Sequence, residues 1–295
     1  MSPPLSMRGR LSWLGHDLTV AAPDPVWFSW LEDFTGLAVR TEEADPSGCR
    51  AAPPVLSVVD DRHALVDGND LRSFSSLNNL KAWLFLTVSD VMIERGGFTA
   101  FHAAGFIVDG RAVLVSGRPW AGKSSWAFAA AERGLDVLGD DQVLVDAAVG
   151  LVYGLPRPMK RRIISGAETT SSPSAAVRAS LDDEEIVLVP RRTAGLAPVD
   201  RGYPVSQIVH LSRHRGPGIV PISLDSFTVI RTVLDQMRGR PSAFLRQTAA
   251  AARMLSRLRN SGLSVGDGEI ARGLDAVLDS VHHGGDESHL RTHQG

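Results

Sequence analysis

The sequence is poor in cysteine and in lysine. Cys49 is its single cysteine, and only Lys81, Lys123 and Lys160 are lysines among 31 basic residues. One cysteine cannot form a disulfide within the chain, so we expect a reducing compartment. Because arginine fills nearly every basic position, a lysine that stands inside a motif is hard to explain by chance.

The sequence also lacks an excess of charge and a long hydrophobic run. Its net charge is −2, which gives no electrostatic case for nucleic acid or for a membrane surface as a partner. The most apolar segment, Ala82–Ile93, is too short to span a bilayer and contains Asp90. His16 and Asp17 interrupt any apolar signal core near the start. With 43% hydrophobic residues over 295 positions, we expect a cytoplasmic protein with a substantial core.

A phosphate-binding motif, G-x-x-x-x-G-K-[ST], lies between an apolar run at Ala112–Val115 and a small-residue segment that predicts a helix at 123–133. Glycines allow main-chain N–H groups to turn toward phosphate oxygens, and the positive end of the following helix attracts them. Lys123 would reach the β- and γ-phosphates, and Ser124 would bind Mg²⁺. A plain glycine turn is the alternative. The predicted nucleotide-binding residues are Gly117, Arg118, Pro119, Trp120, Ala121, Gly122, Lys123, Ser124 and Ser125.

Two residues of this motif differ from the small residues that many such loops carry. Pro119 has no N–H group to offer to a phosphate, and Trp120 is large. We therefore expect a loop of unusual shape, with Trp120 packed over its rim.

An acidic pair, Asp140-Asp141, follows a second apolar run at Leu135–Leu138. In phosphoryl transfer, one carboxylate can help to hold Mg²⁺ while another accepts the proton of the attacking hydroxyl. Neighbouring residues on a strand point to opposite faces, so both can serve one site only where the strand ends and the chain turns. Gly139 permits such a turn. A solvated turn without a catalytic role is the alternative.

The segment that leads to the phosphate loop reads as a β-hairpin, with Asp109-Gly110 at its turn. The strand that feeds the loop should therefore pair antiparallel with its predecessor. His102 stands just before the hairpin, between Phe101 and Ala103. It could be a packed core residue, but the hairpin would bring it back toward the phosphate loop, which makes it a candidate for the site.

These elements together resemble a known kinase core. Phe101-His102-Ala103-Ala104, the hairpin, the phosphate loop and Gly139-Asp140-Asp141 resemble the HPr kinase/phosphorylase and phosphoenolpyruvate carboxykinase superfamily over residues 76–240. Tyr153–Lys160 resembles the Pro-Arg-Pro segment of HPr kinase-related proteins, and the chain is similar in size to lasso peptide precursor kinases. The resemblance implies an α/β P-loop kinase core with a mixed, partly antiparallel sheet. It implies ATP and Mg²⁺ as cofactors and a serine hydroxyl, most readily on a ribosomally made precursor peptide, as the acceptor.

The resemblance also implies roles for individual residues. Asp140 would be the base and Asp141 would bind the metal together with Ser124, although the two aspartates could exchange roles. His102 would lie near the transferred phosphate, and Lys123 would act on the phosphates. Two other functions stay open: a kinase of a small molecule such as free serine, and a nucleotide-binding regulatory module without transfer. A homo-oligomer also stays open.

A basic cluster follows the Pro-Arg-Pro segment. Arg157, Lys160 and Arg161 could neutralise a triphosphate or a phosphorylated product, whereas the alternative is a solvated basic loop. His210 alternates with apolar neighbours and is expected to be packed.

The predicted organisation has three parts: a small mixed or β-rich region at 1–75, a catalytic domain at 76–281 and a disordered tail at 282–295. We expect a mobile loop at Ser165–Asp183, either one that orders over a peptide substrate or a linker with no role. The expected elements are helices at 76–95, 225–237, 242–259 and 269–281, a hairpin with its turn near 146–150, and core strands at 184–190 and 205–211.

Overall fold

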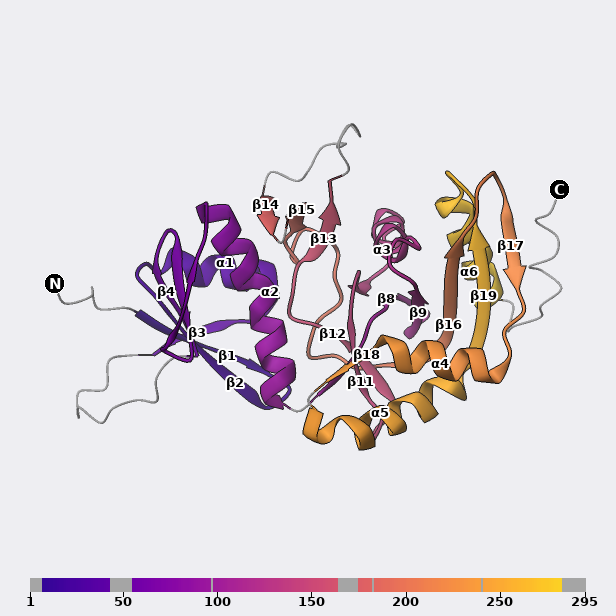
Figure 1. The fold of residues 1–295 in the computed structure, drawn as a ribbon, viewed down its shortest axis with the longest axis horizontal. Coiled ribbons are helices and arrows are strands. Elements are labelled where there is room, and N and C mark those ends of the chain that lie inside the picture. Colours follow the sequence, from indigo (N-terminus) through magenta and orange to yellow (C-terminus); the bar gives the residue numbers. More distant parts are fainter. Residues whose placement is uncertain are drawn as a thin grey trace. The chain divides into compact units, whose positions relative to one another are not determined.

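The computed structural model describes residues 7–42, 55–96, 98–163, 175–181, 183–239 and 241–282. They form a mixed α/β structure with parallel and antiparallel strand pairs, as predicted (Figure 1). By its tertiary contacts the chain divides into two compact units, and each unit is built from two separate segments. The first unit comprises residues 1–96 and 156–194, and the second comprises 97–155 and 195–295. This division differs from the predicted boundary after residue 75.

The larger sheet of the first unit has six strands in the order β3-β1-β2-β4-β5-β6. Its strands are β1 (Met7–Trp13), β2 (His16–Ala22), β3 (Val39–Glu42), β4 (Leu56–Asp60), β5 (His63–Val66) and β6 (Asp70–Ser73). Two helices accompany it, α1 (Val26–Thr35) and α2 (Leu77–Gly96). Phe34 of α1 stacks on Phe85 of α2 with ring centroids 4.2 Å apart. The helix predicted at 76–95 is therefore present, but its contacts place it with the N-terminal strands.

The smaller sheet of the first unit has three strands in the order β13-β15-β14. They are β13 (Met159–Arg162), β14 (Val177–Leu181) and β15 (Glu184–Val189). The strand predicted at 184–190 is thus present, but it does not belong to the core of the phosphate-loop unit. The loop predicted at Ser165–Asp183 is wrong over 177–181, because these residues pair with β15 from Val177↔Leu188 to Leu181↔Glu184. Residues 164–174 lie outside the described residues.

The second unit contains a ten-stranded sheet. The main path runs β10-β8-β9-β16-β12-β11-β7-β18, and β19 joins both β16 and β17. The strands are β7 (Thr99–Phe101), β8 (Ala104–Val108), β9 (Arg111–Gly117), β10 (Val137–Gly139), β11 (Val143–Asp146), β12 (Leu151–Gly154), β16 (Tyr203–Arg213), β17 (Ile219–Ile222), β18 (Met237–Gly239) and β19 (Arg259–Val265). Its helices are α3 (Lys123–Glu132), α4 (Ser226–Gln236), α5 (Pro241–Ser256) and α6 (Ile270–His282).

The strand before the phosphate loop has one antiparallel and one parallel neighbour. β8 and β9 form the predicted hairpin, with Asp109 and Gly110 both at positive φ (50° and 72°) in its turn. On its other side β9 pairs parallel with β16, and β16 pairs parallel with β19. The predicted antiparallel approach to the loop is confirmed. The strand β19 was not predicted, and the helix expected at 242–259 ends before it, at Ser256.

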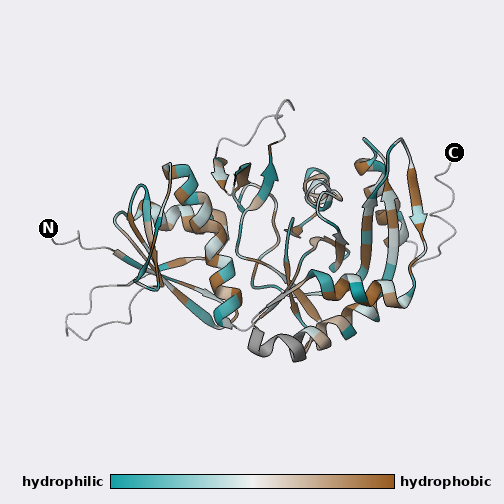
Figure 2. Cartoon of the chain, viewed as in Figure 1, coloured by the Kyte–Doolittle hydropathy of each residue, from teal (hydrophilic) through white to brown (hydrophobic). Residues whose placement is uncertain are grey.

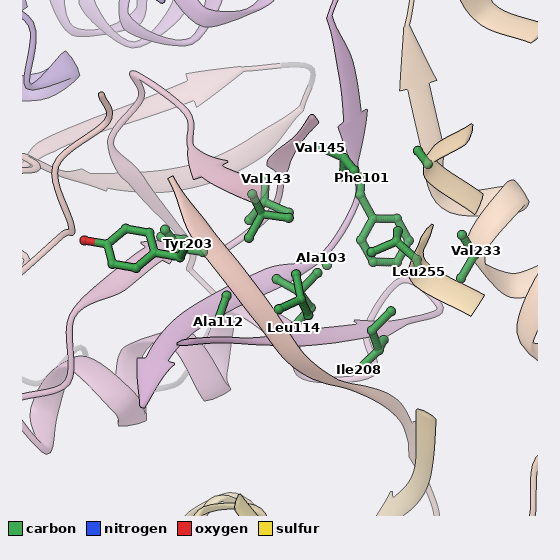
Figure 3. Packing of buried hydrophobic residues seen from close by; sticks show 14 of the residues in the cluster. Phe101, Ala103, Ala112, Leu114, Val143, Val145, Tyr203, Ile208, Val233 and Leu255 are labelled. Atoms are coloured by element: carbon green, nitrogen blue, oxygen red, sulfur yellow. The ribbon is translucent and has the colours of Figure 1, made fainter. Parts of the chain in front are cut away.

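The core of the second unit lies where the strands meet α4 and α5. Its buried members include Phe101, Leu114, Ile208, Val233 and Leu255, which Figure 3 shows packed in one cluster. Apolar and polar stretches alternate along α4, as Figure 2 shows. This alternation is what a helix with one face on a sheet requires.

The remaining sequence predictions concern helix ends and the tail. Asp225 caps α4 as predicted, because its carboxylate accepts a hydrogen bond from the main-chain N–H of Thr228 at 2.8 Å. The predicted tail at 282–295 lies outside the described residues after His282, where α6 ends. In the described part of the chain, no helix has the length and apolar character needed to cross a membrane.

Candidate nucleotide-binding site

The phosphate loop begins at the buried C-terminal end of β9. Ala112, Val113, Leu114 and Val115 are fully buried, and Gly117 pairs with Leu211 of β16. A Cβ atom at Gly117 would lie 2.4 Å from the main-chain oxygen of Leu211. Because backbone cannot retreat as a flexible side chain can, only glycine fits at this first position of the motif.

The loop then turns back toward the helix that follows. Pro119 and Trp120 occupy the centre of a turn closed by a hydrogen bond from the Ala121 N–H to the Arg118 carbonyl (3.1 Å). Trp120 has a φ of 68°, in the left-handed region, which costs a non-glycine residue about 1–2 kcal/mol. In this turn the Trp120 residue is 65% exposed. The expectation that Trp120 packs over the rim of the loop is therefore wrong, since most of its surface is open.

Helix α3 begins with the motif lysine and points its N-terminus at the loop. Gly122 precedes the helix at a φ of 103°, and the helix spans Lys123–Glu132. The side chain of Lys123 is 6% exposed. Its Nζ donates hydrogen bonds to the main-chain oxygens of Gly117 (2.9 Å) and Arg118 (3.3 Å), so the ammonium group lies inside the curve of the loop. This is where a phosphate oxygen would meet it.

Asp140 lies beside the first turn of α3. The Ser124 hydroxyl donates to the main-chain oxygen of Asp140 at 3.3 Å, which places the residue that follows β10 next to the phosphate loop. Asp140 is 3% exposed. The chain turns sharply here, because a Cβ atom at Gly139 would lie 3.0 Å from the main-chain oxygen of Gln142. The strand thus ends as predicted, and the acidic pair sits on the bend.

Asp141 lies next to His102. The Nε2 atom of His102 is 3.0 Å from Asp141 Oδ1, and the two side chains are 22% and 25% exposed. The main-chain N–H of His102 donates to the oxygen of Gln236 at 2.8 Å, so the end of α4 holds the histidine in place. A partly exposed imidazole held by a carboxylate can accept or pass on a proton. The structure therefore brings together Lys123, Ser124, Asp140, Asp141 and His102 in the second unit.

The donor set at this end of the sheet suits Mg²⁺ bound with a nucleotide. A magnesium ion in such sites takes one or two protein oxygens and completes its shell with phosphate oxygens and water. The Ser124 hydroxyl and the carboxylate of Asp140 are oxygen donors of this kind. Among the described residues no group of three or more His, Cys, Asp and Glu could hold a metal.

The chain is similar to a kinase of known structure, among other solved chains. The HPr(Ser) kinase/phosphatase from Coxiella burnetii matches it with 14% sequence identity and a TM-score of 0.30, over 62% of this chain and 95% of that chain. Comparisons with protein-family models and with curated protein sequences found no match.

The predicted basic cluster lies in the first unit. Arg157 is 9% exposed and its Nη1 lies 3.9 Å from Asp90 Oδ1. Lys160 is half-buried on β13, and Arg161, next to it, is exposed. Because the phosphate loop belongs to the second unit, the role of these three residues toward a phosphate stays a prediction.

Two features near the loop were not identified as part of the site from the sequence. One is Gln236, whose main-chain oxygen holds His102, and nothing in the sequence could indicate a contact between residues so far apart. The other is a buried polar row next to the loop. His210 pairs in register with Ser116, the residue before Gly117, and its Nε2 lies 2.8 Å from the Asn260 amide oxygen. Alternation on a strand indicated that His210 is packed, which its 7% exposure confirms.

The orientation of Asn260 defines the state of His210. The amide nitrogen of Asn260 donates to the main-chain oxygens of Leu255 (3.2 Å) and Leu258 (2.7 Å), so its oxygen faces the imidazole. The Nε2 atom of His210 must then carry the hydrogen. Burial lowers the pKa of His210 below its usual value, and the hydrogen bond to Asn260 opposes that shift.

Proposed function

We propose that this protein is an ATP- and Mg²⁺-dependent phosphotransferase that transfers the γ-phosphate to a serine hydroxyl. The acceptor we propose is a ribosomally made peptide, of the kind that lasso peptide precursor kinases modify. The serine and the peptide rest on the resemblance of the His102, phosphate-loop and Asp140-Asp141 segments to that kinase group. The phosphotransfer itself rests on the geometry of the second unit.

One observation carries the proposal. Groups from four separate segments gather at the end of one sheet: the phosphate loop after β9, the acidic pair after β10, His102 after β7 and the end of α4. The Ser124–Asp140 and His102–Asp141 contacts join them pairwise. A nucleotide-binding module without transfer would need the loop but would have no use for a partly exposed carboxylate–imidazole pair beside it.

The chain's own groups account for binding and for proton transfer. Main-chain N–H groups of the loop and the ammonium group of Lys123 would bind the phosphates and neutralise charge that develops during transfer. Asp141 orients His102, and this pair is open enough to accept the proton of an incoming hydroxyl. Asp140 is more buried than Asp141 and lies next to Ser124, so we assign it as the metal ligand rather than the base. We therefore favour Asp141 as the base and Asp140 as the metal ligand, the reverse of the order that the resemblance implied.

The first test is removal of the lysine. Lys123→Ala should abolish ATP turnover, because it removes the ammonium group that contacts the main-chain oxygens of Gly117 and Arg118 inside the loop. Turnover is measured as release or transfer of labelled γ-phosphate in a single-turnover assay. Lys81→Ala is the matched control: it makes the same chemical change in the first unit, where Lys81 stacks 3.3 Å above the ring centroid of Trp30. Full activity of Lys123→Ala with normal folding would overturn the proposal.

The second test separates the two aspartates. Asp141→Asn should leave ATP binding nearly unchanged and lower the rate of transfer by about 10²–10⁴-fold, the usual contribution of a positioned base. Asp140→Asn should instead weaken Mg²⁺-dependent nucleotide binding. Binding is measured by calorimetry and transfer by phosphate incorporation into serine. The opposite pattern would restore Asp140 as the base. Transfer to free serine but not to peptide would favour the small-molecule kinase.

A further inference from the structure

The first unit contains a groove that the phosphotransfer chemistry does not use. One cavity of ≈ 600 Å³ is lined by residues of β6, α2 and β14 and by the segment between β6 and α2. It shares Leu86 and Leu181 with a second cavity of ≈ 240 Å³, which Lys160, Glu184 and Ile186 complete. Because Leu86 of α2 and Leu181 of β14 line both cavities, the two cavities adjoin, and together we call them the groove. Its size is that of sites for small ligands or short peptides.

The two walls of this groove are strands at the edges of two different sheets. β6 pairs with β5 alone and ends the six-stranded sheet, whereas β14 pairs with β15 alone and ends the three-stranded sheet. The strand order shows no further partner for either strand in the described part of the chain. An edge strand offers a row of main-chain donors and acceptors to any extended chain that lies beside it.

The register of β6 shows which groups face outward. The Phe74 N–H donates to the Arg62 carbonyl at 2.8 Å, so the pair Arg62–Phe74 is hydrogen-bonded. In an antiparallel ladder bonded and non-bonded pairs alternate, and therefore Arg72 points its main-chain groups toward β5. The N–H and C=O groups of Leu71 and Ser73 point away from β5. The outer edge of β6 thus carries two donors and two acceptors at the spacing of a strand.

The edge of β14 is already attached to the helix. The Ser180 N–H donates to the amide oxygen of Asn79 on α2 at 2.8 Å, and the amide nitrogen of Asn79 donates to the Ser75 hydroxyl at 2.7 Å. One side chain thus ties β14 to α2 and to the segment that follows β6. Asn79 thus holds β14 and the segment after β6 together at this end of the groove. Because the Ser180 N–H is already bonded to Asn79, the edge of β6 is the wall that we expect to accept an additional strand.

The floor of the groove is one face of α2. It runs from Asn79 through Trp83, Leu86 and Thr87 to Asp90, which lies eleven positions further along the helix. At about 1.5 Å per residue this face is about 16 Å long. An extended chain rises about 3.3 Å per residue, so the floor accommodates about five residues. Phe74 and Trp83 add an aromatic surface there, with ring centroids 5.1 Å apart.

We propose that this groove binds an extended peptide segment of about five residues, which pairs with the outer edge of β6. A peptide is the ligand that supplies main-chain donors and acceptors in alternation, as Leu71 and Ser73 require. Alternate side chains of the peptide would face the aromatic and aliphatic floor, and the others would face solvent. The inference rests on the proposed function in one respect: it takes this peptide to be part of the acceptor substrate.

The experiment uses a peptide selected on the protein itself. A displayed library of random 12-residue peptides is selected on the full chain, and the most enriched peptide is synthesised with a fluorescent label. Its binding is then measured by anisotropy on Ser73→Pro and on the control Thr41→Pro. Proline removes an N–H group that points away from the sheet in both variants, so an edge strand tolerates it. Thr41 lies on β3, the opposite edge of the same sheet.

We expect Ser73→Pro to weaken binding at least tenfold and Thr41→Pro to leave it unchanged. N-methylation of the peptide at successive positions should weaken binding at every second residue, because only alternate N–H groups pair with β6. If both proline variants keep full affinity, if N-methylation shows no alternation, or if no peptide is enriched, the inference is wrong. If wild-type protein turns over ATP but binds no peptide, the inference about the groove is wrong while the proposed phosphotransferase function stands. Edge-dependent peptide binding without ATP turnover contradicts the proposed function alone.

Discussion

His210 is kept neutral in the interior of the second unit. Its Nδ1 atom and the hydroxyl of Ser116 are buried polar atoms without a hydrogen-bond partner in the structure, and Nε2 is held by Asn260. A charged imidazole there would lack the solvation that it has in an unfolded chain. Protonation of His210 would therefore destabilise β16 next to the phosphate loop, because His210 pairs in register with Ser116, the residue before Gly117.

Stability should therefore fall on acidification. Burial lowers the pKa of His210 in the folded protein, so below about pH 6.5, the ordinary value for histidine, the unfolded chain binds more protons than the folded one. Unfolding is favoured progressively from that pH down to the folded pKa, by about 1.4 kcal/mol for each unit of difference. The loss of thermal stability between pH 7.5 and 5.5 should shrink in His210→Gln. His16→Gln, at the partly exposed first residue of β2, is the control, and equal losses in both variants would contradict this assignment.

At this scale the sequence was informative wherever a residue type has few alternatives. A lysine between glycine and serine, an aspartate pair after an apolar run and a histidine before a hairpin all lie in the second unit, and the aspartate pair contacts both Ser124 and His102. The predicted packing of Trp120 over the rim of the loop was wrong, because the turn at Pro119–Trp120 directs the indole outward. The partners of His102 and His210 lie on elements distant in the sequence, which no local pattern encodes.

Among the elements, α1 ends at a position that only glycine can fill easily. Gly36 caps the helix at a φ of 73°, and its N–H donates to the Glu32 carbonyl at 2.9 Å. A Cβ atom there would lie 3.1 Å from Cδ and from Nε of Arg191, which is 5% exposed. Burial lowers the pKa of Arg191 to about 9, so the guanidinium remains charged at neutral pH. Because the residue is buried, its side chain has little room to move.

Gly36→Ala should destabilise the protein more than Gly15→Ala. Gly15 has a similar φ of 81°, but nothing lies within 4 Å of a Cβ atom there, so its substitution adds only left-handed strain of about 1–2 kcal/mol. Gly36→Ala adds the displacement of Arg191, for which overpacking typically costs about 1–3 kcal/mol. Urea unfolding of the two variants measures the difference. Equal midpoints would mean that Arg191 yields without cost.

Elements with a strong period or a clear turn were predictable. The β8–β9 hairpin, α3, α4 and α6 all form close to their expected bounds. Two strands that were not predicted share a cause: β14 and β19 both contain serine and arginine, and each is stabilised by its neighbouring strands rather than by its own composition. A strand whose residues are not themselves strand formers depends on tertiary contacts, which the local sequence does not contain.

At the scale of the whole molecule, the chain passes between the two units three times. It leaves the first unit after residue 96, returns at 156 and leaves again after 194. The predicted boundary after residue 75 followed the change from short strands to a long helix. The helix itself packs with the strands before it, so composition alone could not place the boundary.

A fragment that begins at residue 76 should therefore be incompletely folded. It retains α2 but loses α1 and the six-stranded sheet, so Leu80, Leu84, Phe85 and Val88, all fully buried in the complete chain, become exposed. Limited proteolysis should cut the fragment within 77–96 and 183–194 and spare 98–155, whereas the full chain should resist cleavage in all three ranges. A fragment as resistant as the full chain would show that residues 1–75 fold separately.

The exposed Trp120 in the phosphate loop should make the intrinsic fluorescence of this protein sensitive to nucleotide binding. Trp126, in the helix that follows, is sealed from solvent, so its emission has no reason to respond to events at the surface. Trp120 lies three residues before Lys123, and the residue is 65% exposed. Its fluorescence should respond to nucleotide arriving in the loop, which makes occupancy readable without a dye.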